Sequence, residues 1–173
     1  RNYRVRNNTK LDINIAENLT FSSRFAADYL ETEEKYYDNI FYGDAADVGG
    51  AVSDNSTRNF NYVWQNTLGY IWVPNSDHNF TFKGISESQR NYRFYLGAFG
   101  EGIAAPGLYN LNTVASPQGV GSSTTDWAVQ SFTGLVNYGF QGKLYADASL
   151  RYEGNSRFAA DERWGTFYAL GLG

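Results

Sequence analysis

Aromatic and polar side chains alternate through residues 59–73, NFNYVWQNTLGYIWV, and this alternation constrains the fold more than any other stretch of the chain. Even-numbered positions carry nearly every large ring, and odd-numbered positions carry most of the polar groups. Because successive residues of a β-strand point to opposite faces, the rings share one face. From Phe60 to Trp72 the strand covers about 40 Å, or roughly 30 Å across a bilayer at a tilt of about 40°. The pattern predicts one wall strand of an outer-membrane β-barrel, with rings near both water interfaces and Leu68 between them.

The composition is compatible with a membrane barrel and argues against other classes. Aromatic residues make up 17% of the 173 residues, and the 18 glycines suit turns and packed strands better than helices. No apolar run approaches the roughly 20 residues of a membrane helix, but a barrel needs none because only alternate residues face lipid. The mean hydropathy of -0.48 is therefore no objection. A net charge of -4 argues against nucleic acid as a partner, and the absence of cysteine removes disulfide and thiolate chemistry.

The alternation continues along the chain and predicts seven strands. We place them at residues 9–15, with Tyr3 as the alternative start of this first strand, and at 19–30, 59–73, 78–90, 127–140, 144–152 and 163–173. Short turns are expected at 16–18, 74–77 and 141–143, a moderate loop at 153–162, and long irregular loops at 31–58 and 91–126. Short turns that alternate with long loops are typical of a transmembrane barrel, in which the short turns are periplasmic and the long loops extracellular.

Seven antiparallel strands are not a complete barrel of the bacterial single-chain type, which has an even strand number. An open edge in hydrocarbon leaves N–H and C=O groups that each cost several kcal/mol. We therefore interpret residues 1–173 as the partial wall of a larger barrel, or as a sheet whose edges pair with another polypeptide. The chain begins at Arg1 without a signal peptide, so we interpret it as processed or as an internal piece.

No catalytic constellation is evident. His78 is the only histidine, so neither a Ser-His-Asp triad nor a two-histidine metal site can be built, and its turn position favours a surface or interface residue. The acidic loop 31–58 contains Asp44, Asp47 and Asp54, and clustered carboxylates can bind Ca²⁺. Their spacing is not that of an EF-hand, and a solvated loop is the alternative. We expect no other cofactor and no enzyme activity.

Three groups of side chains are candidates for binding or positioning. In the loop 91–126, flat rings that can stack on sugars or peptides are Tyr92, Phe94, Tyr95, Phe99 and Tyr109; the alternative is that they pack the loop. Inward positions that can set selectivity in a lumen are Arg24, Asp28, Gln65, Lys83, Asp147 and Arg151; the alternative is that they pair across the wall. A turn network near the extracellular rim is expected from Arg151, Glu153, Arg157 and Arg163. Lipid-facing or interfacial anchors are expected at Trp64, Trp72, Trp127 and Trp164.

The run LRYEGNSRFAADERWGTFYALGLG, residues 150–173, resembles a signature of SusC/RagA-like TonB-dependent outer-membrane transporters. In that family a strand ends in a turn of the type Arg-Arg-Asp-Gly-Ser-Ser-Arg-Phe-Gly, followed by Arg-Trp-Gly-x-Phe-Pro-Ser. The matching positions here are Gly154, Ser156, Arg157, Phe158, Arg163, Trp164, Gly165 and Phe167. Glu153 replaces the aspartate, Asn155 the first serine, and residues 168–169 the Pro-Ser pair. Weaker similarities occur at residues 16–21, 64–68 and 78–81.

The resemblance implies a barrel of 22 strands in the bacterial outer membrane, an N-terminal plug that occludes the lumen, and a periplasmic contact with TonB that supplies energy. It also implies a surface lipoprotein of the SusD type and the import of nutrients such as oligosaccharides or peptides. Neither the plug domain nor the TonB contact segment is recognisable in this chain. Two other functions stay open at this point: an outer-membrane channel without TonB coupling, and a secreted β-sandwich that binds carbohydrate, because a sandwich also buries one face of each sheet.

Overall fold

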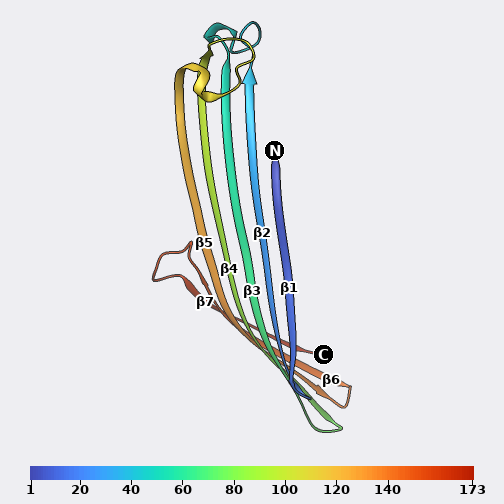
Figure 1. The fold of residues 1–173 in the computed structure, drawn as a ribbon. Helices are drawn as coiled ribbons and strands as arrows, with labels where there is room; N and C mark the ends of the chain where they lie inside the picture. The colour runs from blue at the N-terminus through green and yellow to red at the C-terminus, as the bar shows by residue number, and fades with distance from the viewer. The chain divides into compact units, whose positions relative to one another are not determined.

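A computed structural model describes residues 1–173 and contains seven β-strands in one sheet, in the order β1-β2-β3-β4-β5-β6-β7. Each strand thus lies beside its neighbour in sequence, as the colour order in Figure 1 shows. The strands are β1 (Asn2–Ala16), β2 (Leu19–Asp38), β3 (Ala51–Asn75), β4 (His78–Ile103), β5 (Val114–Phe140), β6 (Leu144–Asn155) and β7 (Trp164–Leu172). Two short 3₁₀ helices, Ala46–Val48 and Leu111–Thr113, lie in the connections. No helix is long and apolar enough to cross a membrane.

The tight turns follow from local backbone chemistry. Between β5 and β6, Gln141 and Gly142 adopt positive φ angles of 51° and 66°, and the Lys143 amide donates to the Phe140 carbonyl at 2.9 Å. Positive φ at consecutive positions is typical of tight hairpin turns. The turn sets an antiparallel register in which Phe140 lies opposite Leu144 and Gly134 opposite Leu150. The predicted short turn at 141–143 is confirmed, the one at 16–18 is confirmed to within a residue, and the one at 74–77 shortens to 76–77 because β3 continues to Asn75.

Strands β2 to β5 are longer than the sequence pattern predicts. The predicted irregular loops 31–58 and 91–126 are therefore wrong in their bounds. β2 continues to Asp38 and β3 begins at Ala51, so the irregular part of 31–58 shrinks to residues 39–50. Likewise β4 continues to Ile103 and β5 begins at Val114, which leaves residues 104–113 of the predicted 91–126. The extensions of β2 and β3, residues 31–38 and 51–58, carry polar side chains on both faces, so they lack the alternation by which a strand is recognised. Residues 91–103 alternate in part, but their glycines favour a loop in the sequence.

The chain divides into two compact units. Unit 1 comprises Arg1–Val5, Asp28–Phe60 and Tyr92–Asp126. It holds all the buried apolar side chains of the chain, namely Ala45, Ala51, Val52 and Ile103. Glycine is required beside this small core: Gly50 has a φ of +83°, and a Cβ there would lie 2.5 Å from Cγ2 of Ile40. The connection between β2 and β3 therefore folds back onto its own strands, as a structure in water does.

Unit 2 comprises Arg6–Ala27, Asn61–Asn91 and Trp127–Gly173. None of its apolar side chains is buried, and Leu170 and Leu172 are 79% and 91% exposed. A soluble β-sandwich needs a second sheet packed on the first to form its core, whereas all seven strands here share one sheet. The sandwich hypothesis is therefore not supported by the fold, and the apolar face of unit 2 has no protein layer in this chain to cover it.

Candidate functional site

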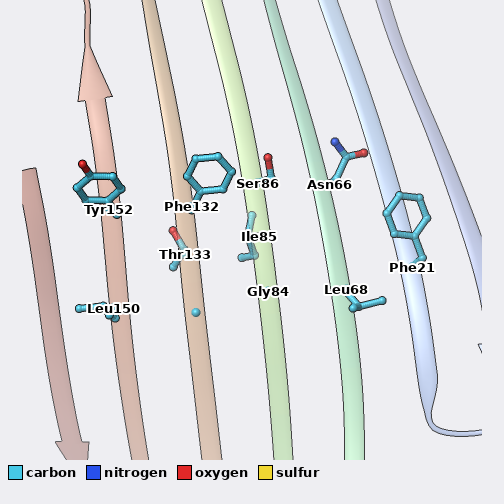
Figure 2. A pocket seen from close by; sticks show the side chains of 11 residues that line it. Phe21, Asn66, Leu68, Gly84, Ile85, Ser86, Phe132, Thr133, Leu150 and Tyr152 are labelled. Atoms are coloured by element: carbon cyan, nitrogen blue, oxygen red, sulfur yellow. The ribbon is translucent and has the colours of Figure 1, made fainter. Parts of the chain in front are cut away.

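The apolar face of unit 2 carries rings and aliphatic groups from adjacent strands. Figure 2 shows Phe21, Leu68, Phe132, Leu150 and Tyr152 around one hollow of about 570 Å³. They share a face because Phe132 lies opposite Tyr152 in the β5–β6 register, and because alternate residues of a strand point the same way. This hollow lies on the apolar side of the sheet, so it is a feature of the outer wall rather than a polar substrate pocket.

A belt of stacked rings lies at the end of unit 2 that contains the tight turns. Trp72 stacks on Phe80 with ring centroids 5.1 Å apart, and Phe80 stacks on Tyr138 at 4.7 Å. His78 lies in the same belt, with Nδ1 2.8 Å from the Tyr138 hydroxyl and its ring 5.1 Å from that of Phe140. Because the stacked rings and the Tyr138 hydroxyl surround the imidazole of His78, the structure gives it a packing role.

A second set of rings lies on β3, β6 and β7. The Trp64 indole donates to the Ser23 hydroxyl at 3.0 Å, and Tyr152 stacks on Trp164 at 4.7 Å. Tyrosine and tryptophan are suited to a membrane interface because one end of the side chain is apolar and the other can hydrogen-bond. Rings at both ends of an apolar band are the arrangement that the sequence predicts for Trp64, Trp72 and Trp164.

The polar face of unit 2 holds a chain of hydrogen bonds and ion pairs that runs over three strands. Gln65 of β3 donates to Glu87 of β4 at 3.0 Å, and an Arg151 guanidinium nitrogen on β6 lies 3.6 Å from the other Glu87 oxygen. Arg151 also pairs with Glu153 at 2.5 Å. The predicted lumen residues Gln65 and Arg151 are thus joined by Glu87, which sequence reasoning missed. Its position in β4, four residues after Lys83, is the signal that places it on the same face.

A second polar cluster lies on β1 and β2. Arg24 donates through Nε to Asn8 at 3.1 Å, and Asp12 accepts from Ser22 and pairs with Lys10 at 2.9 Å. A hollow of about 600 Å³ is lined by Asn8, Lys10, Ser22, Arg24, Gln65 and Thr67. Arg24 and Gln65, both predicted to face a lumen, therefore share one hydrophilic hollow.

The other predicted lumen residues lie apart from these clusters. Asp28 belongs to unit 1, where it receives two hydrogen bonds from the Arg4 guanidinium, one of them 2.9 Å long. Asp147 lies opposite Gly171, and a Cβ at Gly171 would be 2.4 Å from an Asp147 carboxylate oxygen. The Lys83 side chain is exposed. No single site gathers all six residues, and their roles in selectivity stay predictions.

The candidate ligand aromatics are divided by the structure. Tyr95 and Phe99 line one shallow hollow of unit 1 together with Ser53, Asn55 and three glycines, Gly97, Gly119 and Gly121. The Tyr95 hydroxyl donates to Oδ1 of Asn55 at 2.9 Å and lies over Gly97, where a Cβ would be 2.3 Å from it. Because Gly97 has no side chain, the Tyr95 ring lies flat along the strand.

The remaining three aromatics do not join this hollow. Tyr92 and Phe94 occupy the alternate positions of β4 and so lie on its opposite face from Tyr95. Tyr109 packs edge-to-face on Tyr37 at 4.7 Å. Tyr109 thus has a packing contact with Tyr37 although its side chain is 55% exposed, and Tyr95 and Phe99 are 36% and 39% exposed.

The residues of the 150–173 motif build the β6–β7 turn. Ser156 exchanges hydrogen bonds with Ala128: its amide donates to the Ala128 carbonyl at 2.9 Å, and its hydroxyl accepts from the Ala128 amide at 2.8 Å. Gly154 leaves room for Trp164, since a Cβ there would lie 2.7 Å from the indole. Arg163 donates to the Phe158 carbonyl at 3.2 Å. The matching residues therefore have a structural role in attaching the turn to β5.

The predicted network of Arg151, Glu153, Arg157 and Arg163 is wrong as a single cluster. Arg151 and Glu153 form an ion pair, but the Arg157 guanidinium lies 4.3 Å from the centroid of Trp127, and Arg163 donates to the Phe158 carbonyl of its own turn. The sequence places these charges close together, but strand alternation and the turn direct them to different neighbours.

The acidic connection of unit 1 shows local pairing. Glu31 accepts from Arg58 at 3.1 Å and from the Tyr29 hydroxyl at 3.0 Å. The second of these bonds, aided by partial burial, raises the pKa of Tyr29. No group of three or more His, Cys, Asp or Glu side chains converges to hold a metal ion. Calcium binding by Asp44, Asp47 and Asp54 stays a prediction.

Two curated proteins match parts of the sequence. The TonB-dependent receptor P39 of Formosa agariphila is 37% identical over 65 residues, which cover 38% of this chain and 6% of that protein. The TonB-dependent receptor SusC of Bacteroides thetaiotaomicron is 42% identical over 43 residues, which cover 25% of this chain and 4% of that protein. No protein-family model matches the chain.

Solved structures match the whole fold. The RagAB peptide transporter superposes with a TM-score of 0.93 at 22% identity, over 99% of this chain and 19% of that chain. The RagAB peptide importer in its open-open state gives a TM-score of 0.89 with the same coverage. The chain thus spans less than a fifth of the length of these structural neighbours. The predicted resemblance is confirmed: the chain has the fold of a segment of an outer-membrane β-barrel and is similar to SusC/RagA-like TonB-dependent transporters.

Proposed function

We propose that this chain forms part of the barrel wall of an outer-membrane TonB-dependent transporter that imports nutrients, with oligosaccharides and peptides as the two substrate classes. The observation that carries the proposal is the one-layer sheet of unit 2, which has rings and aliphatic groups on one face and linked charges on the other. Only a wall between lipid and water gives both faces a suitable environment without a second layer.

The polar face then lines the lumen. The Gln65–Glu87–Arg151 chain and the Arg24 hollow place fixed charges and hydrogen-bonding groups beside the path of a solute. Such inward groups tune selectivity in barrels. They perform no covalent chemistry, and the energy for uptake comes from TonB through a plug domain carried by the complete protein.

Partners of the complete protein follow from the same likeness. We expect the rest of the barrel to pair with the outer edges of β1 and β7, because strand edges in hydrocarbon must be paired. A SusD-like surface lipoprotein is expected at the extracellular mouth. Tyr95 and Phe99 are the two candidate rings that share one hollow there, and Asn55 accepts a hydrogen bond from the Tyr95 hydroxyl.

The test is uptake by cells that carry the complete open reading frame around this chain. Labelled neutral oligosaccharides and labelled short peptides are supplied to wild-type cells, to cells lacking the frame, and to cells in which TonB is inactivated. We expect loss of the frame and loss of TonB to abolish uptake of the same substrate. Uptake that survives without TonB would instead assign a passive channel, and no difference between the strains would overturn the proposal.

A matched pair of substitutions tests the ligand face. Tyr95→Ala removes the exposed ring held by Asn55, whereas Tyr92→Ala removes a ring of the same size from the opposite face of β4. We expect the first change to reduce substrate binding, because the aromatic surface on which a substrate can stack and the hydrogen bond that orients this ring are both lost. The second should leave binding near wild type. If both substitutions changed substrate binding equally, Tyr95 would not be part of the binding surface.

A further inference from the structure

The hydrophilic hollow of unit 2, of about 600 Å³, is rich in hydrogen-bond donors and is lined by no carboxylate. Its lining combines two cationic, two amide and two hydroxyl side chains: Arg24, Lys10, Asn8, Gln65, Ser22 and Thr67. Two carboxylates contact lining residues, but both are engaged within the wall. Asp12 accepts from Ser22 and pairs with Lys10. Glu87 accepts from Gln65. The hollow therefore presents donors to a solute, while the acidic groups beside it already have partners.

The two cations of this hollow differ in their partners. Lys10 pairs with Asp12 at 2.9 Å, so its charge is balanced within the wall. Arg24 has no acidic partner, and its Nε donates to the neutral Oδ1 of Asn8 at 3.1 Å. An arginine guanidinium carries N–H donors on Nε and on both terminal nitrogens. The bond through Nε therefore orients the planar guanidinium and leaves its two terminal nitrogens, together with a full positive charge, without a partner in the protein.

The unpaired end of Arg24 matches a carboxylate in charge and in shape. A carboxylate is a planar group with a single negative charge, and its two oxygens accept in parallel from the two terminal nitrogens of a guanidinium. The Thr67 hydroxyl lines the same hollow without a hydrogen-bond partner in the protein, so it offers a further donor. A neutral hydroxyl or amide gains only an ordinary hydrogen bond from the same groups. The hollow therefore distinguishes solutes by their charge.

Resting on the proposed function, which places this polar face along the lumen, we propose that Arg24 selects solutes that carry a carboxylate as they pass the wall. The carboxylate belongs to a uronate of an acidic oligosaccharide or to an acidic side chain of a peptide, since both present the same group. One carboxylate is bound at a time, because Asp12 balances the charge of Lys10. The Arg24 side chain is exposed to water, so the ion pair is weak enough for the solute to move on.

The test is TonB-dependent uptake by cells that carry the complete open reading frame, measured with two matched pairs of radiolabelled solutes. One pair is an oligogalacturonate and its methyl ester. The other is an N-acetylated, C-amidated peptide that contains glutamate and the same peptide with glutamine. We expect wild type to take up the acidic member of one pair about fivefold faster than its neutral partner, the factor that an exposed ion pair can supply. The pair that shows this preference identifies the source of the carboxylate.

Three variants assign the preference to Arg24. Arg24→Gln should bring the ratio of acidic to neutral uptake close to one, chiefly by slowing the acidic member, and Arg24→Lys should keep part of the preference because it keeps the charge. Lys143→Gln is the matched control, since it removes the same charge from the exposed β5–β6 turn outside the hollow, and it should keep the wild-type ratio. Added salt should lower the wild-type ratio, because exposed charges are screened. Heat-dependent gel mobility confirms that each variant is a folded barrel.

The outcomes separate this inference from the proposed function. TonB-dependent uptake without a charge preference in either pair would overturn the inference alone. So would a wild-type ratio in Arg24→Gln, including the case in which both members slow alike, because Arg24 would then contact another part of the protein rather than the solute. An equal loss of the preference in Lys143→Gln would assign it to the overall charge and not to the hollow. No TonB-dependent uptake of any solute by wild type would instead overturn the proposed function, and this inference with it.

Discussion

Unit 1 buries Val52 to 1% exposure and also buries Ala45, Ala51 and Ile103, whereas unit 2 leaves Leu172 91% exposed and buries no apolar side chain. The same strands contribute to both units. Burial of apolar surface away from water is the main favourable contribution to folding. Unit 1 achieves it with its own residues. Unit 2 achieves it only when something apolar covers its outer face, so one chain contains a part built for water and a part built for lipid.

The difference teaches where substitutions should matter. In unit 2, stability depends on the match between the apolar face and hydrocarbon, so a charge there is costly. In unit 1, it depends on a few packed side chains, so a cavity is costly while an added surface charge is not. Each of the following changes is measured in the complete protein by urea unfolding in phospholipid vesicles unless stated otherwise.

The largest expected effect is that of a charge on the apolar face. Leu68→Arg should lower the free energy of unfolding by about 2 to 4 kcal/mol, the cost of arginine near the midplane of a bilayer. Val120→Arg in unit 1, where the side chain is 78% exposed, should change it by less than about 0.5 kcal/mol. Similar costs at the two positions would break the distinction between the units.

The next effect is a cavity in the core of unit 1. Val52→Ala should cost about 2 kcal/mol, because it removes two buried methyl groups from a packed site. The control is Val73→Ala in unit 2, at a side chain that is 55% exposed to begin with. If Val52→Ala were as harmless as its control, unit 1 would not be stabilised by its own core.

A smaller effect is expected on the polar face. Arg151→Gln removes ion pairs with Glu87 at 3.6 Å and Glu153 at 2.5 Å, but all three side chains are partly exposed to water. Each such pair contributes up to about 1 kcal/mol to the free energy of unfolding and is screened by salt. The cost should therefore shrink when salt is added. A double-mutant cycle with Glu87→Gln isolates the shared part, and a coupling independent of salt would contradict a water-lined face.

The smallest effect is the ionisation of a single tyrosine in unit 1. The hydrogen bond to Glu31 raises the pKa of Tyr29, so the protonated phenol is favoured in the folded chain. This contribution to stability is present below the ordinary tyrosine pKa of about 10 and is lost as the pH rises through the raised folded value. Glu31→Gln should move the Tyr29 absorbance transition to lower pH. An unchanged transition would show that Glu31 does not control the phenol.

The sequence predicts unit 2 well because lipid on one side and water on the other impose alternation on its strands. The seven strands, their order and the three tight turns follow from that pattern. It fails in unit 1, where segments such as residues 31–38 carry polar side chains on both faces and do not alternate. The motif that contains Gly154 and Trp164 is identified through its resemblance to a family signature. Its structural role is visible only in the fold, where the absence of a side chain at Gly154 leaves room for the Trp164 indole.

Contacts that depend on register are beyond the sequence pattern. Glu87 bridges Gln65 and Arg151 because three strands align at that level, and no spacing within one strand reveals it. Tyr92 and Tyr95 lie on opposite faces because β4 continues through both residues and alternate residues of a strand face opposite sides. The sequence pattern does not show that β4 extends this far. The hollow of about 570 Å³ on the apolar face combines residues of five strands, β2 to β6, and only the sheet brings them together.

β5 is far longer than the strand that pairs with it. β6 aligns with β5 only from Val129 onward, so residues 114–126 have no β6 partner along that edge. A bare strand edge in water is a template on which other chains can aggregate. The sequence of this stretch, VASPQGVGSSTTD, contains a proline, glycines and small hydroxyl side chains rather than β-branched or aromatic hydrophobes in series. Because proline lacks the N–H that strand pairing needs and glycine weakens a strand, this segment is a poor template for another chain.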